Sequence, residues 1–190
     1  MFDTLVQAPN TTSVIVNTHQ ASFLAGAAAA LTSSTGTLGF LGGVGFENPV
    51  GGHDAARELY EEGADIVFAA AGTSGLGVFQ AASEVTAESG IFRWAIGVDT
   101  DENETVVERP LGVDPIPLQR HILTSVVKHS DVVVRDALLA YDRGDAVPGV
   151  RTVGLAEGAV DISYSGGFLD SLRPTLESLR RSILAGAATL

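Results

Sequence analysis

Short apolar runs alternate along the chain with amphipathic segments. The run at residues 64–71 (ADIVFAAA) leads into a glycine-rich stretch and a helix-like segment over 78–87, and a second run, 94–98, ends on Asp99. Continuous apolar strands are typical of a parallel sheet that is covered on both faces. Ligands of such sheets bind beyond the carboxyl ends of the strands. The glycine stretch and Asp99 both follow strands of this kind, so the pattern predicts the edge of a binding site there.

The same pattern predicts further strands and helices on either side of this block. We expect strands near residues 14–16, 37–41 and 122–126. We expect helices over 22–31, 53–62 and 172–184, and a further helix that ends at 141. Residues 101–118 are expected to form a loop, and 153–164 an extended ribbon. Strands that alternate with helices predict an α/β fold with a doubly wound parallel sheet. A connection between parallel neighbouring strands needs a dozen or more residues. Only a few residues separate the strand at 37–41 from the next helix, so a segment expected between them is absent.

Length and composition indicate a globular chain. Its 190 residues are 45% apolar with a mean hydropathy of +0.26, enough for one large domain or the better part of two lobes. No apolar run is long enough to cross a bilayer, and the start lacks the charged and apolar regions of a signal peptide. The absence of cysteine excludes disulfides, thiolate metal sites and cysteine nucleophiles, and also a lipid-anchored amino-terminal cysteine on this chain.

The charge is strongly acidic. A net charge of −12 argues against nucleic acid as a partner, because no basic patch can release counterions from phosphates. The cations other than histidine are ten arginines and a single lysine, Lys128. An acidic excess with so little lysine suits a protein solvated in concentrated salt, and an acidic protein from a GC-rich genome is an equally good interpretation.

Five motifs occur in an order that is typical of one family. They are SFLAGAAAAL, LGFLGG, GADIVFAAAGTSGLGVF, WAIGVDTDE and LTSVVK. With these motifs the chain resembles the basic-membrane-protein family, the purine-nucleoside-receptor-like substrate-binding proteins of ABC importers. The resemblance covers nearly the whole chain but only the later part of the family's usual length.

The resemblance implies a periplasmic-binding-protein type I-like fold, in which two doubly wound lobes close over a nucleoside. The second lobe is expected to be largely present and the first mostly missing, with residues 1–20 as its remnant, 21–150 as the second lobe, and 151–190 as a ribbon and C-terminal helix returning toward the first lobe. A second gap is expected between Val44 and Gly45, where the family has one helix–strand unit of about 30 residues. Loss of this unit would bare a new sheet edge.

The resemblance also implies where a nucleoside would bind. Phe46 matches the aromatic that stacks on the base, Asp99 the aspartate that accepts hydrogen bonds from ribose hydroxyls, and Lys128 a ligand-contacting lysine. An aromatic face, a carboxylate facing two O–H donors and an ammonium group suit these roles chemically. The alternative interpretations are a phenylalanine that covers the core, an aspartate that ends the strand and a lysine on a solvated helix face.

Four residues of the glycine stretch, Gly72, Ser74, Gly75 and Gly77, match the family's loop near the ribose. Glycines at a strand–helix junction let the backbone approach a ligand, and the helix N-terminus offers free N–H groups; a tight turn into a helix is the alternative. The spacing G-x-x-G-x-G is not the dinucleotide motif and no Lys-Ser/Thr pair follows, which disfavours phosphate binding. The four histidines show no metal-ligand spacing, so we expect solvated or capping roles and no metal site.

Together these observations predict the substrate-binding component of an ABC importer for nucleosides, with no enzymatic activity and no cofactor. The resemblance implies the permease and ATPase subunits of the importer as partners. Members of the family are anchored to the cell membrane outside the cytoplasm. In this sequence we find no leader and no anchor cysteine, so its location is left open. A single lobe loses about half of the contacts of a cleft, so weak or absent binding is expected. Two alternatives are a ribose- or nucleoside-acting hydrolase that uses Asp99 and Asp101, and a non-functional remnant.

Overall fold

Two sheets organise the protein, for which the computed structural model describes residues 4–6, 8–43, 47–106 and 117–187. The larger sheet has five strands in the order β2-β3-β4-β5-β7, and the smaller sheet pairs β1 with β6. All neighbouring strands run parallel except β5 and β7. The strand bounds are β1 Thr12–Val16, β2 Leu38–Gly42, β3 Ile66–Ala70, β4 Trp94–Asp99, β5 Ile122–Lys128, β6 Gly149–Val153 and β7 Val160–Ile162.

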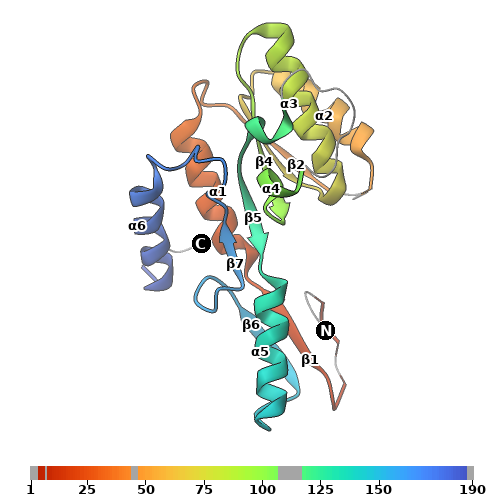
Figure 1. Ribbon diagram of the computed structural model, residues 1–190, viewed down its shortest axis with the longest axis vertical. Helices are drawn as coiled ribbons and strands as arrows, with labels where there is room; N and C mark the ends of the chain where they lie inside the picture. Colours follow the sequence, from red (N-terminus) through yellow and green to blue (C-terminus); the bar gives the residue numbers. More distant parts are fainter. Residues whose placement is uncertain (1–3, 7, 44–46, 107–116, 188–190) are drawn as a thin grey trace.

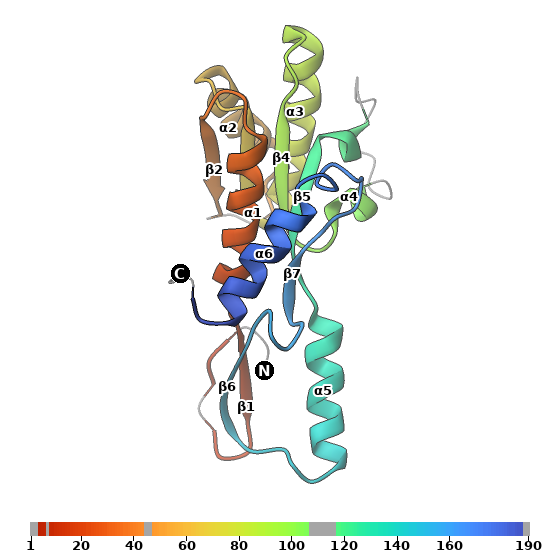
Figure 2. The same cartoon turned by 90° about the vertical axis from the view of Figure 1, so that its left-hand side faces the viewer.

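Helices cover both faces of the larger sheet. Figures 1 and 2 show α1 and α6 on one face and α2 and α3 on the other, while α5 extends beside β1 and β6. The helix bounds are α1 Thr18–Thr32, α2 Pro49–Glu61, α3 Gly75–Ser89, α4 Glu102–Thr105, α5 Ser130–Asp142 and α6 Arg173–Leu184, with short 3₁₀ turns at Gly72–Ser74 and Leu118–His121. The expected doubly wound α/β fold is therefore confirmed.

Alternation along β3 shows why this sheet is covered on both faces. Ile66 belongs to the core beneath α1, whereas the next residue, Val67, belongs to the core beneath α2 and α3. Both side chains are almost wholly buried. Successive side chains of a strand point to opposite faces, so a run without polar residues requires cover on both sides.

The chain passes three times between the two sheets, from β1 to α1, from β5 to α5 and from β6 to β7. The ribbon expected over 153–164 is extended only in part: it starts at the last residue of β6, turns over 155–158 and contains β7. Strand β6 pairs with β1 in the smaller sheet, and β7 pairs with β5 in the larger one. Helix α6, which the sequence predicts over 172–184, packs against α1 and buries Leu176 and Ile183. The division of the chain into 1–20, 21–150 and 151–190 stays a prediction.

Three helices begin earlier than the apolar pattern predicts, among them α3, which begins at Gly75 rather than at 78. Helix α1 begins at Thr18 rather than at 22, and α2 begins at Pro49 rather than at 53. In α2 the side chain of Asn48 accepts a hydrogen bond from Gly51 N at 3.0 Å, and proline suits the first helical position because its missing N–H is not needed there. The loop expected over 101–118 also contains the short helix α4. No helix in the described ranges combines the length and apolar character that a membrane crossing needs.

A buried aspartate fixes the turn between α1 and β2. The carboxylate of Asp65 accepts hydrogen bonds from Ser33 Oγ at 2.7 Å, from Ser34 N at 2.6 Å and Oγ at 2.9 Å, and from Thr35 N at 3.0 Å. Burial alone would raise the pKa of Asp65, but these hydrogen bonds outweigh it and lower the pKa below its ordinary value. The carboxylate therefore stabilises the native turn in its charged form.

We expect Asp65→Ala to reduce the free energy of unfolding by about 2–3 kcal/mol at neutral pH, because the charge-assisted hydrogen bonds to the buried carboxylate are lost. Since the native pKa lies below the unfolded one, the contribution is complete above about pH 4 and disappears as the pH falls through the native pKa. Urea unfolding at several pH values measures the difference. The exposed Asp145→Ala serves as the control; a difference for Asp65→Ala that does not shrink in acid would contradict the interpretation.

Candidate ligand-binding pocket

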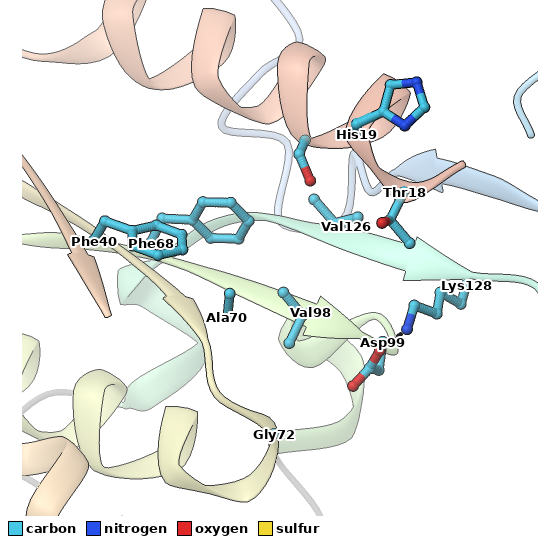
Figure 3. Close-up of a pocket in the computed structure, with 11 residues that line it drawn as sticks. Thr18, His19, Phe40, Phe68, Ala70, Gly72, Val98, Asp99, Val126 and Lys128 are labelled. Atoms are coloured by element: carbon cyan, nitrogen blue, oxygen red, sulfur yellow. Dashed lines mark ion pairs between the residues drawn. The ribbon is translucent and has the colours of Figure 1, made fainter. Parts of the chain in front are cut away.

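A pocket of about 500 Å³ lies at the carboxyl ends of β3, β4 and β5. Its walls come from the first turns of α1, from β2 to β5, and from Gly72 at the start of the glycine loop (Figure 3). No residue of β1, β6 or α5 is among the described lining residues. The pocket is therefore built from the larger sheet and its helices, and it lies where parallel α/β sheets bind ligands.

The polar end of the pocket holds an ion pair. Lys128 Nζ lies 3.2 Å from Asp99 Oδ1, and both side chains line the pocket (Figure 3). The Asp99 side chain is 54% exposed, so the carboxylate is open to a ligand as well as to the lysine. A pair this exposed adds little to stability.

Asp99 has an unusual backbone conformation. Its φ of 70° is the one positive value among non-glycine residues in the described part of the chain. Aspartate adopts this left-handed region more readily than most residues, and such conformations cluster at binding sites. The conformation ends β4 at Asp99, the residue whose carboxylate reaches Lys128.

The apolar end of the pocket is aromatic. Phe40 of β2 and Phe68 of β3 are register partners, and their rings meet edge to face with centroids 5.7 Å apart. Phe40 is 64% exposed, whereas Phe68 packs against the core. Edge-to-face pairs of this kind are favourable, and an exposed ring can also stack on a planar ligand.

A third wall comes from the beginning of α1. Thr18, His19 and Ser22 line the pocket, and the side chain of the preceding Asn17 does not cap the helix. This part of the lining adds hydroxyl groups and an imidazole ring, which can donate or accept hydrogen bonds.

The structure brings three of the sequence-predicted residues together, namely Gly72, Asp99 and Lys128, which all line this pocket. Ser74 is buried elsewhere: its Oγ accepts a hydrogen bond from Asn48 N at 3.1 Å, and it borders a separate hollow of about 220 Å³ beside α2. Gly75 is buried at the start of α3, where an added Cβ would lie 3.6 Å from that of Ala69.

Phe46, the predicted stacking residue, lies outside the described residues. The structure instead presents Phe40 and Phe68, which the sequence interpretation treated only as strand residues. A signal for them existed in the printed sequence. Residues 68 and 70 share one face of a strand, and LGFLGG places an aromatic in the neighbouring strand. What the sequence lacked was the register that pairs the two phenylalanines.

The second carboxylate of the hydrolase alternative, Asp101, lies outside the pocket. It accepts hydrogen bonds from Ser163 Oγ at 2.5 Å and Ser165 Oγ at 2.6 Å. The described residues contain no cluster of three metal-ligating side chains.

The expectation of a solvated or capping histidine is wrong for His121. Its side chain is fully buried, stacks on Phe92 and contacts the carbonyl of Arg93 at 2.8 Å. Burial lowers the pKa of His121, which favours the neutral ring. This histidine is therefore a core residue.

Comparison with known proteins identifies relatives over nearly the whole chain. The family model described as Bmp, ABC transporter substrate-binding protein PnrA-like, matches residues 1–51 and 45–186. A "CD4+ T-cell-stimulating antigen" of Listeria monocytogenes is 30% identical, over 97% of this chain and 60% of the relative. An "ABC transporter nucleoside-binding protein BmpA" of Lactococcus lactis is 24% identical, over 95% of this chain and 60% of the relative. The chain thus spans about 60% of the length of these curated relatives.

Two features of the matches concern the break expected after Val44. The aligned region with the Listeria protein has 219 positions, more than the 190 residues of this chain, so the relative contains residues with no counterpart here. The two matched pieces of the family model meet at residues 45–51. They therefore join next to the position where the resemblance places the missing helix–strand unit.

Solved structures show the same fold. A solute-binding protein of an ABC transporter system from Aeropyrum pernix superimposes with a TM-score of 0.71 at 19% identity, covering 99% of this chain and 69% of that one. At this identity the likeness shows the fold alone. Fold, motifs and family model concur: the chain belongs to the Bmp family of PnrA-like ABC transporter substrate-binding proteins.

Proposed function

We propose that this chain binds a nucleoside in the pocket at Asp99 and Lys128, as the substrate-binding component of an ABC importer whose permease and ATPase are its partners. The observation that carries the proposal is one pocket with an aromatic pair at one end and a carboxylate–ammonium pair at the other. A nucleoside has the same division, because a planar base is joined to a sugar with neighbouring hydroxyls. The name of the Lactococcus relative, which specifies nucleoside binding, supports this ligand class.

Each end of the pocket suits one part of such a ligand. The carboxylate of Asp99 can accept hydrogen bonds from two ribose hydroxyls, and the ammonium group of Lys128 can donate to ribose or base oxygens and nitrogens. The exposed ring of Phe40 offers a stacking surface, which contributes about 1–3 kcal/mol per base. A pocket of about 500 Å³ lies within the usual range for small-molecule sites.

The described lining of the pocket comes only from one part of the molecule, with nothing from β1, β6 or α5, and we infer weak binding from this. All of the described lining residues come from the larger sheet and its neighbouring helices. High-affinity sites bury most of the ligand surface, and a ligand held from one side keeps much of its surface in water. In this proposal, tight binding requires further contacts to the ligand, from residues outside the larger sheet and its neighbouring helices.

Isothermal titration calorimetry in high salt, combined with amide chemical-shift mapping, tests the proposal. Adenosine and guanosine are expected to bind with a Kd of about 1 mM or weaker and to shift amides at Asp99, Lys128 and Phe40, whereas ribose or free base alone binds less. Micromolar or tighter binding would show that the inference of weak binding is wrong. Unchanged amides at about 10 mM nucleoside would contradict the ligand class. Release of free base over time would support the hydrolase alternative.

A further inference from the structure

We propose that a second copy of this chain pairs antiparallel with β2, so that the larger sheets of the two copies become one continuous sheet. The inference rests on the open edge of β2, on the absence of charge along it and on its exposed apolar side chains. It does not depend on the identity of the ligand.

The first observation is that β2 ends the sheet. It pairs with β3 on one side, and no described strand pairs with its other side, which forms the lateral limit of the sheet in Figure 2. An edge strand presents a row of backbone N–H and C=O groups that another strand can pair with. In the sequence, β2 lies next to the junction of the two matched pieces of the family model.

The second observation is that the strand itself and the segments on either side of it carry no charge. Residues 20–46 contain no Asp, Glu, Lys, Arg or Pro, although the chain as a whole has a net charge of −12. Natural edge strands usually carry charges or proline that prevent pairing. Two copies of so acidic a chain repel each other over most of their surface, so the uncharged edge is where they can approach at least cost.

The third observation is a self-complementary pattern of side chains. Leu38 and Phe40 are 46% and 64% exposed and lie on the same face of β2, and Phe40 is the middle residue of the strand. Antiparallel pairing about Phe40 places each copy's Phe40 opposite the other, with Leu38 opposite Gly42. Directly opposed aromatic side chains in an antiparallel pair contact one another and stabilise it.

Other exposed strands are less suited to a second copy. Beside β1, Val6 and Ser13 exchange hydrogen bonds of 2.9 and 3.1 Å, so the chain already approaches this strand. Strand β6 carries Arg151, and Asp161 of β7 forms an ion pair with Arg180 at 2.8 Å. Among the described strands, β2 alone combines an unpaired edge, no charge and exposed large apolar side chains.

Pairing would also change the pocket. Phe40 lines the pocket from β2, on the side where the sheet ends. In the proposed pair, the second copy's Phe40 lies across this open side and extends the aromatic wall. This consequence, unlike the interface itself, rests on the proposed function.

Analytical ultracentrifugation of the full chain tests the interface, with matched substitutions of two exposed leucines. The native chain is expected to sediment as a dimer, and Leu38→Lys to raise the dimer Kd about tenfold or more, equivalent to about 1.4 kcal/mol. Leu138→Lys, at a 64% exposed position on α5, is expected to leave the dimer intact. Thermal unfolding of both variants checks that they fold.

The absence of cysteine allows a second, direct measurement. Under mild oxidation, Phe40→Cys is expected to form a disulfide-linked dimer, because the two residues face each other, whereas Leu138→Cys stays largely monomeric. A native chain that is monomeric throughout the concentration range would overturn the proposal. Dissociation by Leu138→Lys but not by Leu38→Lys would overturn it as well, by placing the interface on α5.

Discussion

Replacing Asp99 with alanine is expected to abolish the nucleoside-induced amide shifts at the pocket. A charge-assisted hydrogen bond contributes about 1.5–3 kcal/mol, so its loss weakens binding roughly tenfold to a hundredfold. Starting from millimolar affinity, a decrease of this size removes the signal from the accessible concentration range. The measurement is the same shift titration with adenosine and guanosine.

Two further variants separate the carboxylate from the backbone conformation at this position. Alanine adopts the positive φ of Asp99 with some strain, whereas glycine adopts it freely. Asp99→Gly is therefore expected to lose binding while keeping the native unfolding temperature. Asp145→Ala removes an equal charge from another exposed ion pair, with Arg143, and is expected to bind as the native chain does. Unchanged nucleoside shifts in Asp99→Gly would contradict the assigned role of the carboxylate.

The second large effect is expected at Gly77, where α2 and α3 pack closely. A Cβ at Gly77 would lie 1.8 Å from the carbonyl oxygen of Pro49 and 2.6 Å from the amide nitrogen of His53. Both atoms belong to the backbone of α2, so the overlap can be relieved only by moving one helix. We expect Gly77→Ala to reduce the free energy of unfolding by about 3 kcal/mol or more, as measured by urea unfolding.

Gly26 provides the matched control for this substitution. It lies within α1, and an added Cβ would meet no atom within 4 Å. Gly26→Ala is therefore expected to stabilise the protein by about 0.5–1 kcal/mol, because alanine loses less conformational freedom in a helix. If both variants lost a similar amount of unfolding free energy, the close approach of α2 and α3 would not be the reason that glycine is needed at Gly77.

The chemistry of the pocket could be predicted only in part from the sequence. Asp99 and Lys128 end two strands that proved to be neighbours, and residues at the carboxyl ends of adjacent parallel strands meet at one edge. Phe40 and Phe68 come from neighbouring strands whose pairing register has no local signal. His19 and Ser22 reach the pocket because α1 begins beside it, which depends on how the helix packs on the sheet.

The sequence by itself determined the α/β class, the alternation of strands and helices, and the family, because burial on two faces leaves continuous apolar runs and amphipathic helices in the local pattern. Only the tertiary structure decided that β6 and β7 belong to different sheets, that His121 is buried, and that β2 is left at the edge with Phe40 exposed. These features follow from contacts between residues far apart in the chain. The free energy of such contacts depends on which surfaces meet, and a local pattern of residues does not specify that.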